Sequence, residues 1–158
     1  MIMAIDVSNT NITLGTFKGE KLLKIYRVTT KVPRTSDEYG VLLRDLVRLS
    51  NASHHDIEGV IIASVVPNVM YSLTNACIKY FHVHPVIVGP GVKTGVKVGA
   101  ENPKEAGSDL IVNAAAVKEL YGVPAIVIDY GTATSYQLVL EDGKLDSVEI
   151  GRASCRER

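Results

Sequence analysis

Two stretches of the sequence end an apolar run with an aspartate and continue with small and hydroxyl side chains. The first covers residues 1–15, MIMAIDVSNTNITLG, and its aspartate is Asp6. The second covers residues 125–138, AIVIDYGTATSYQL, and its aspartate is Asp129. The residues that follow are Ser8, Asn9 and Thr10 in the first stretch and Gly131, Thr132, Ala133 and Thr134 in the second. Both stretches predict a buried strand, a polar turn and a returning strand.

These residue types suit the binding of a phosphate group and a cation. Small side chains let the backbone approach a ligand, successive turn N–H groups attract an anion, and hydroxyls add donors. An aspartate at the strand end adds a hard oxygen ligand for Mg²⁺ or a monovalent cation. Two such hairpins facing each other would hold a nucleoside triphosphate between two halves of the chain. The alternative for each hairpin is an ordinary turn, in which Asp, Asn, Gly and Thr are common, but their repetition favours the ligand site.

The segments between these stretches predict a mixed sheet with helices packed on it. Three antiparallel strands come first, and strands then alternate with helices, which is the ribonuclease-H-like arrangement. The first helix has a capping-box signature, Thr35 with Glu38. Strands are expected at 2–7, 11–17, 21–29, 59–66 and 86–88, helices from Thr35 to Asn51, from Pro67 onward and from about Ser108 to Tyr121, and a loop at 92–104.

After Gly122 the same plan begins again and then stops. Strands are expected at 123–129, 135–141 and 144–150, whereas the segment GRASCRER that follows has no large apolar side chain and three arginines. A hairpin of this kind is only marginally stable by itself, so the natural chain is expected to continue past Ile150. The expected division is a first domain at 1–121, an incomplete second domain at 122–150 and a non-native tail at 151–158, with a natural disordered tail as the alternative.

Composition and charge exclude several classes of function. The chain has 158 residues, 46% hydrophobic and 22% charged, which is typical of soluble globular proteins. A net charge of zero gives no bulk attraction to nucleic acid or to an anionic membrane. The sequence has neither a membrane-spanning apolar run nor a signal peptide, so a cytoplasmic location is expected. Two cysteines give no disulfide framework, and the four histidines lack the spacing of a structural zinc site.

Three motifs together resemble one known family. They are D-x-x-N-T-x-x-x-x-G from Asp6 to Gly15, NPKEAGSDLIVNAA from Asn102 to Ala115, and D-x-G-T-A-T from Asp129 to Thr134. Each motif is weak alone, but their order and spacing resemble those of the type III pantothenate kinases over residues 1 to about 150. These are bacterial enzymes of the acetate/sugar kinase, Hsp70 and actin superfamily.

The resemblance implies an actin-like ATPase fold and a kinase activity. The expected reaction is ATP-dependent phosphorylation of pantothenate to 4′-phosphopantothenate, the first step of coenzyme A synthesis. The resemblance also implies a homodimer when the protein is full length, Mg²⁺ with the ATP, and a monovalent cation, K⁺ or NH₄⁺. The present chain is expected to be inactive alone, because the cleft needs both domains to close around ATP.

The resemblance also assigns roles to individual residues. Asp6 would organise Mg²⁺ indirectly, Asp129 would bind the monovalent cation, and Asp109 would be the general base. For Asp109 a helix-capping role is the alternative, since Asp is a leading N-cap residue. The residues implied for ATP are Asp6, Val7, Ser8, Asn9, Thr10, Asn11, Ile12, Thr13 and Thr132, and those implied for pantothenate are Gly107, Ser108, Asp109 and Leu110.

Two departures from the family pattern concern recognition of the substrate carboxylate. Many members have Arg where this chain has Leu110, and Tyr where it has Ala100. Lys97 or Lys104 is a hypothetical source of the missing positive charge.

Two rival functions stay open: a nucleotide-binding regulator such as an accessory transcription factor, and an ATPase switch of the Hsp70 or actin kind. The presence of Asp109 favours the kinase over the regulator.

Overall fold

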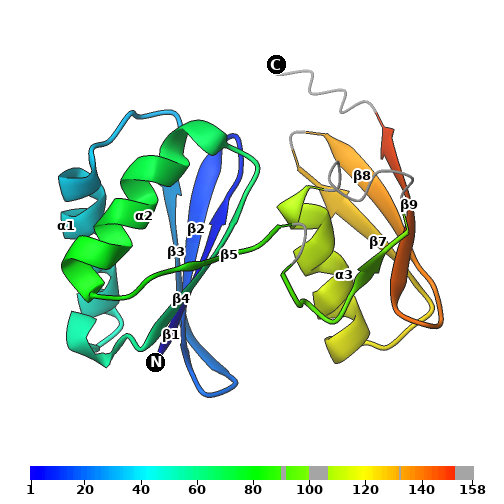
Figure 1. Ribbon diagram of the computed structural model, residues 1–158, viewed down its shortest axis with the longest axis horizontal. Coiled ribbons are helices and arrows are strands. Elements are labelled where there is room, and N and C mark those ends of the chain that lie inside the picture. Colours follow the sequence, from blue (N-terminus) through cyan, green and yellow to red (C-terminus); the bar gives the residue numbers. More distant parts are fainter. Residues whose placement is uncertain (90–91, 100–106, 132, 152–158) are drawn as a thin grey trace. The chain divides into compact units, whose positions relative to one another are not determined.

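The computed structural model describes residues 1–89, 92–99, 107–131 and 133–151 (Figure 1). The chain divides into two compact units, which we call unit 1 (Met1–Ile87) and unit 2 (Val88–Arg158). Each unit contains one of the two aspartate-bearing hairpins. In the described part of the chain, no helix combines the length and the hydrophobicity needed to span a bilayer.

Unit 1 contains a five-stranded mixed sheet in the order β3-β2-β1-β4-β5. The central strand β1 runs antiparallel to β2 on one side and parallel to β4 on the other. Its Asp6 therefore stands at the carboxyl end of a strand that has a neighbour on both sides. The strands are β1 (Ile2–Val7), β2 (Asn11–Lys18), β3 (Lys21–Thr29), β4 (Gly59–Ser64) and β5 (Val86–Ile87).

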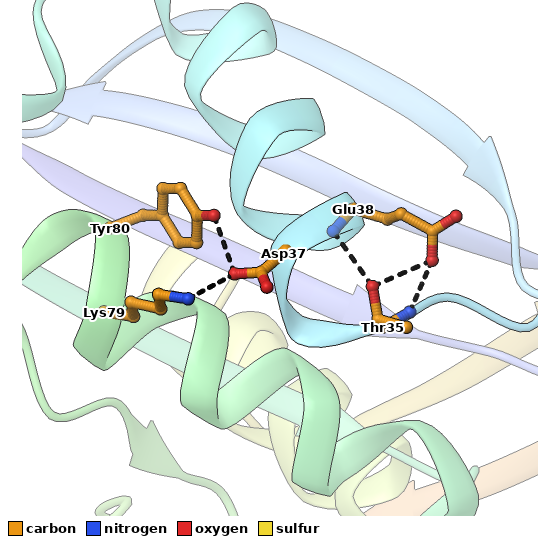
Figure 2. Close-up of polar contacts among 5 residues, drawn as sticks. All are labelled: Thr35, Asp37, Glu38, Lys79 and Tyr80. Carbon is orange, nitrogen blue, oxygen red and sulfur yellow. Dashed lines mark hydrogen bonds and ion pairs between the residues drawn. The ribbon is translucent and has the colours of Figure 1, made fainter.

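Two helices, α1 (Ser36–Leu49) and α2 (Pro67–Phe81), lie side by side on one face of this sheet (Figure 1). Alternate side chains of β1 are buried in one core with Leu43 of α1 and Leu73 of α2. A 3₁₀ turn, η1 (His54–Asp56), precedes β4. The predicted capping box at the start of α1 is confirmed, because the Thr35 hydroxyl accepts from the Glu38 N–H and the Thr35 N–H donates to the Glu38 carboxylate (Figure 2).

The two helices are joined by a polar contact at their exposed side. The Asp37 carboxylate accepts hydrogen bonds from Lys79 Nζ at 2.6 Å and from the Tyr80 hydroxyl at 2.7 Å (Figure 2). The Tyr80 ring lies directly over Gly40, where any Cβ would overlap it. Glycine at this position is what allows α2 to approach α1 so closely.

Unit 2 contains a four-stranded sheet in the order β6-β9-β8-β7, with α3 (Ser108–Leu120) packed against β7 and β8. Among the described residues its buried hydrophobic cluster consists of Ala114, Val139 and Leu145. In this sheet β7 is an edge strand, unlike β1 in unit 1. The strands are β6 (Lys97–Val98), β7 (Ala125–Tyr130), β8 (Thr134–Val139) and β9 (Lys144–Gly151).

The predicted order of elements is confirmed for the described residues, with two differences. Residues 92–104 were predicted as a loop, but Lys97 and Val98 form β6, parallel to β9, while the neighbouring Val96 packs on the unit 2 core. The compact units also differ from the expected domains, because α3 packs on the second sheet and so belongs to unit 2 rather than to residues 1–121. Most of the expected tail, 152–158, lies outside the described residues.

Candidate functional site

The turn from β1 to β2, which we call the first loop (residues 8–10), carries the first group of polar residues. The Ser8 N–H donates to the Asn11 carbonyl at 3.0 Å and closes the turn. Asp6 is half-buried, pairs across the sheet with Thr13, and accepts a 3.1 Å hydrogen bond from the Ser8 hydroxyl. The carboxylate is therefore held in place by the loop that follows it.

The first loop is fastened from a third strand by a residue that the sequence did not indicate. Thr30 follows β3 directly and is buried. Its N–H donates to the Thr10 carbonyl at 3.0 Å, and its hydroxyl donates to the Ser8 carbonyl at 2.7 Å. The one signal available in the sequence was the predicted β2–β3 pairing, which brings the end of β3 back beside this turn.

The first loop presents polar groups of the kind that bind phosphate. The side chains of Asn9 and Thr10 are exposed, and within the described residues their N–H groups have no hydrogen-bond acceptor. Such N–H groups, with nearby hydroxyls, form an anion-binding concavity. In contrast, Val7 and Ile12 are buried in the core, so of these two predicted ATP-binding residues only the backbone could face a nucleotide. Asn11 is exposed and Thr13 half-buried.

The turn from β7 to β8, the second loop (residues 131–133), also joins two antiparallel strands. Asp129 pairs with Ser135, and Tyr130 pairs with Thr134. The Gly131 N–H donates to the Ala133 carbonyl at 3.1 Å. The predicted ATP-binding residue Thr132 lies outside the described residues.

Oxygen-bearing side chains gather on the Asp129 face of unit 2. Asn113 of α3 donates its Nδ2 to Asp129 Oδ2 at 3.4 Å. Gln137, on the same face of β8 as Ser135, is fully buried and donates its Nε2 to the Ser135 hydroxyl at 3.3 Å. Its Oε1 has no hydrogen-bond partner among the described residues. Carboxylate, hydroxyl and amide oxygens are the ligands that hard cations prefer, so this donor set fits a hard cation.

No group of three or more His, Cys, Asp or Glu side chains that could hold a metal ion occurs in the described ranges. At the first loop Asp6 is thus not accompanied by a cluster of further carboxylates. Mg²⁺ that arrives with a nucleotide usually takes one or two carboxylates, phosphate oxygens and water. An indirect role of Asp6 toward Mg²⁺ is compatible with this arrangement.

The third predicted site lies at the N-terminus of α3. Gly107 is the N-cap residue, so Asp109 lies in the first turn and is not the N-cap. One Asp109 carboxylate oxygen accepts from the Leu110 N–H at 2.9 Å. Ser108 is buried, and Leu110 packs on the unit 2 core. The Leu110 side chain therefore takes part in packing, and of the two side chains at positions 109 and 110 only Asp109 carries charge.

Asn113 stands one helical turn after Asp109, so the two residues share one side of α3. Within unit 2, the predicted base Asp109 thus lies on the same side of α3 as Asn113, whose amide contacts Asp129. Cavities of about 640 and 830 Å³ occur elsewhere, around Arg44 and His54 and around Met1 and Lys18. Neither is lined by a predicted site residue.

Comparison with protein families gives a match over nearly the whole chain. The family model described as type III pantothenate kinase matches residues 2–150. A protein named type III pantothenate kinase from Agathobacter rectalis is 53% identical over 143 residues, which are 90% of this chain and 55% of the relative. A protein of the same name from Listeria monocytogenes serotype 4a is 49% identical over the same shares. The chain spans about half the length of these curated relatives.

Comparison with solved structures identifies the fold. The ethanolamine utilization protein EutJ from Carboxydothermus hydrogenoformans is similar with a TM-score of 0.53 and 13% identity, over 96% of this chain and 51% of that one. A putative N-acetylglucosamine kinase from Porphyromonas gingivalis is similar with a TM-score of 0.50 and 18% identity, over 98% and 48%. At these identities the likeness shows the fold alone, and it confirms the predicted ribonuclease-H-like, actin-like ATPase class.

Proposed function

Since the chain belongs to the type III pantothenate kinase family, we propose that the whole protein containing it transfers the terminal phosphoryl group of ATP to the primary hydroxyl of pantothenate. The observation that carries this proposal is the family match over residues 2–150, which includes both loops and the start of α3. The product would be 4′-phosphopantothenate, in the first step of coenzyme A synthesis. We place this activity in the cytoplasm and in a homodimer, as the resemblance implies.

The activity is proposed for a protein about as long as the relatives, because the present chain spans only about half of their length. Residues 122–150 would begin a second domain of the same plan as the first, and residues 151–158 would be a non-native tail. A cleft that closes around ATP and excludes water needs both domains. The present chain alone is therefore expected to lack activity.

In the proposed mechanism, the residues of this chain bind the phosphates and accept a proton. N–H groups and hydroxyls of residues 6–13, with Thr132, hold the phosphates of ATP. Pantothenate lies along residues 107–110, where Asp109 accepts the proton of the attacking hydroxyl. A weakly basic carboxylate is sufficient, because phosphoryl transfer depends mainly on in-line positioning and on neutralisation of charge. Mg²⁺, when bound with ATP, supplies part of that neutralisation.

Asp129 provides the carboxylate for a monovalent cation, K⁺ or NH₄⁺, with the Ser135 hydroxyl and the Gln137 Oε1 on the same face of the strand pair. This role is supported by the buried and unpartnered Gln137 Oε1. For the pantothenate carboxylate, the proposed source of positive charge is Lys97, which is exposed in β6, or Lys104, which lies outside the described residues. If neither Lys97→Ala nor Lys104→Ala raises the KM for pantothenate, this part of the proposal is wrong.

The test is to measure ADP release and 4′-phosphopantothenate formation by the full-length protein with and without pantothenate. The kinase releases ADP only with pantothenate, whereas an ATPase switch releases it without, and a regulator binds ATP without turnover. Asp109→Asn is expected to lower kcat by roughly 10²- to 10⁴-fold. Glu119→Gln, which removes an exposed carboxylate from the other end of α3, is the matched control. An Asp109→Asn protein with an unchanged kcat would remove Asp109 from the role of base.

A further inference from the structure

We propose that Thr30 is a positioning residue of the first loop, which sets the affinity for ATP without itself contacting the nucleotide. The inference rests on the proposed function, since it takes the first loop as the phosphate-binding loop. Thr30 lies outside all three sequence motifs that carry the family resemblance. Its role follows from two hydrogen bonds made by one buried side chain and its own backbone.

The two hydrogen bonds of Thr30 fix the first loop at both ends. The hydroxyl donates to the Ser8 carbonyl at 2.7 Å, and the N–H donates to the Thr10 carbonyl at 3.0 Å. In a trans peptide the carbonyl and the following N–H point in opposite directions. Since the Ser8 carbonyl points toward Thr30, the Asn9 N–H points away from it. Thr30 thus determines which way an N–H group of the loop is presented.

Burial makes this arrangement hard to replace. Thr30 is 7% exposed and Ser8 is half-buried, so the Ser8 carbonyl has limited access to water that could replace the hydroxyl. An acceptor that loses its donor away from bulk water carries an energetic cost, and rotation of its peptide toward water would relieve that cost. Rotation of the Ser8–Asn9 peptide would turn the Asn9 N–H away from the phosphate.

Thr30 is itself held by its neighbours on both sides. The preceding residue pairs with Asn11 in the β2–β3 ladder. After Thr30, Arg34 donates its Nη1 to the Thr29 carbonyl at 2.9 Å and lies over the Tyr39 ring at 5.8 Å. The connection then enters α1 at the Thr35 capping box (Figure 2). The first loop is thereby fastened to the helix layer of unit 1 and not only to its own two strands.

The experiment compares three variants of the full-length protein: Thr30→Val, Thr30→Ser and Thr29→Val. Valine keeps the shape and the backbone N–H of Thr30 and removes only the hydroxyl, whereas serine keeps the hydroxyl. Thr29→Val removes a hydroxyl one residue away, which accepts from the Lys31 N–H and not from the loop. Calorimetric titration with a non-hydrolysable ATP analogue and Mg²⁺ gives Kd, steady-state kinetics give both KM values, and thermal unfolding gives Tm.

Thr30→Val is expected to raise the Kd for the ATP analogue about tenfold, which corresponds to about 1.4 kcal/mol. The KM of Thr30→Val for pantothenate should stay within about twofold of the wild-type value. The Kd and both KM values of Thr30→Ser and Thr29→Val should also stay within about twofold of wild type, since such changes away from a contact have small effects. If the hydroxyl had a purely structural role, Thr30→Val would lower Tm, and the effects on ATP binding and on the KM for pantothenate would be of the same size.

Three outcomes would overturn the inference: a Kd for Thr30→Val equal to that of Thr29→Val, a parallel rise in both KM values, or a Thr30→Val protein that does not fold. The last would assign Thr30 to the folding of unit 1 instead of to the loop. Failure of the proposed function is seen separately, as a wild-type protein that binds ATP but forms no 4′-phosphopantothenate. In that case the ratio of the Kd values for Thr30→Val and Thr30→Ser still decides the role of Thr30.

Discussion

The strands β1 and β7 share a sequence pattern but have opposite environments. Each carries an aspartate, Asp6 or Asp129, near its carboxyl end and large apolar residues at alternate positions before and after it. In β1 these apolar side chains are buried beneath two helices, whereas in β7 they are 46–80% exposed. The side chains at matching positions are Met3, Ile5 and Val7 in β1 and Ile126, Ile128 and Tyr130 in β7.

The difference arises from the neighbours of each strand. β1 lies between β2 and β4, with α1 and α2 on the face that takes its apolar side chains, while β7 is an edge strand. In unit 2, α3 packs on the other face of the sheet, the one that carries Asp129 and Val139. Alternation thus predicts a strand and its two faces, but elements elsewhere in the chain determine which face is covered. We expect the remainder of the longer protein to cover the exposed face of β7.

The largest expected effect is on the reaction rate of Cys77, a thiol buried in the unit 1 core. Burial raises the pKa of the Cys77 thiol to about 12, so its reactive thiolate is scarce at neutral pH. Relative to a free thiol, whose pKa is near 8.5, a disulfide reagent at about pH 8 should react roughly 1000-fold more slowly with Cys77 in the folded chain. The rate should return to that of a free thiol in urea. A Cys155→Ser chain leaves Cys77 as the single cysteine. A fast reaction in the folded state would mean that the unit 1 core opens readily to the reagent.

Truncation of matching residues in β1 and β7 tests the comparison directly. Ile5→Ala should lower the free energy of unfolding of unit 1 by about 3 kcal/mol, because it opens a cavity in a packed core. Ile128→Ala in the same chain should cost less, about 1 kcal/mol, because Ile128 is already 46% exposed. Amide hydrogen exchange of each strand, measured at increasing urea concentrations, gives both changes in free energy.

The same two substitutions also test whether the remainder of the longer protein covers the exposed face of β7. In the full-length protein the cost of Ile128→Ala should approach that of Ile5→Ala. Equal costs in the 158-residue chain would break the comparison, and a small cost of Ile128→Ala in the full-length protein would leave its exposed face without the expected cover.

A smaller effect is expected from the hydrogen bonds of the two aspartates. Asp6 accepts from a hydroxyl of its own loop, whereas Asp129 accepts from Asn113 on a helix. In the full-length protein, Asn113→Leu should therefore raise the K⁺ concentration for half-maximal activity about tenfold, the size of one hydrogen bond to a charged group. The K⁺-dependent rise in Tm should weaken in parallel, and it can be measured without turnover. Asn75→Leu on α2 is the control, and an unchanged K⁺ response in the Asn113 variant would show that the amide does not orient Asp129.

Local patterns in the sequence were sufficient for most elements of the fold. The Thr35 capping box and the three-strand meander were predicted because the residues that form them are close in sequence. The two-residue strand β6 was missed because its pairing with β9 joins segments far apart in the chain.

The candidate site was predicted less completely, for the same reason. The anchor Thr30 contacts Ser8 across 22 positions of sequence, and a threonine after a strand has no distinctive signature. Gln137 is polar, and only the packed structure shows that it is buried. Leu110 was predicted from the family motif to lie at the substrate, but its packing on the unit 2 core depends on the arrangement of α3 against the sheet. Motifs thus identify the residue types of a site, whereas their supports come from tertiary contacts.

The smallest effect is expected from the exposed polar contact between α1 and α2, which has no counterpart on the single described helix of unit 2. Hydrogen bonds from Lys79 and Tyr80 lower the pKa of Asp37, and the Asp37 carboxylate raises the pKa of Lys79 (Figure 2). The stabilisation through Asp37 is thus present above about pH 4 and is lost as the pH falls through its lowered folded pKa. Asp37→Asn should lower Tm slightly at neutral pH, and the difference from wild type should shrink in acid and in high salt. Asp45→Asn, an exposed change on the same helix, is the control, and a Tm difference that persists unchanged at low pH would show that charge on Asp37 does not join the helices.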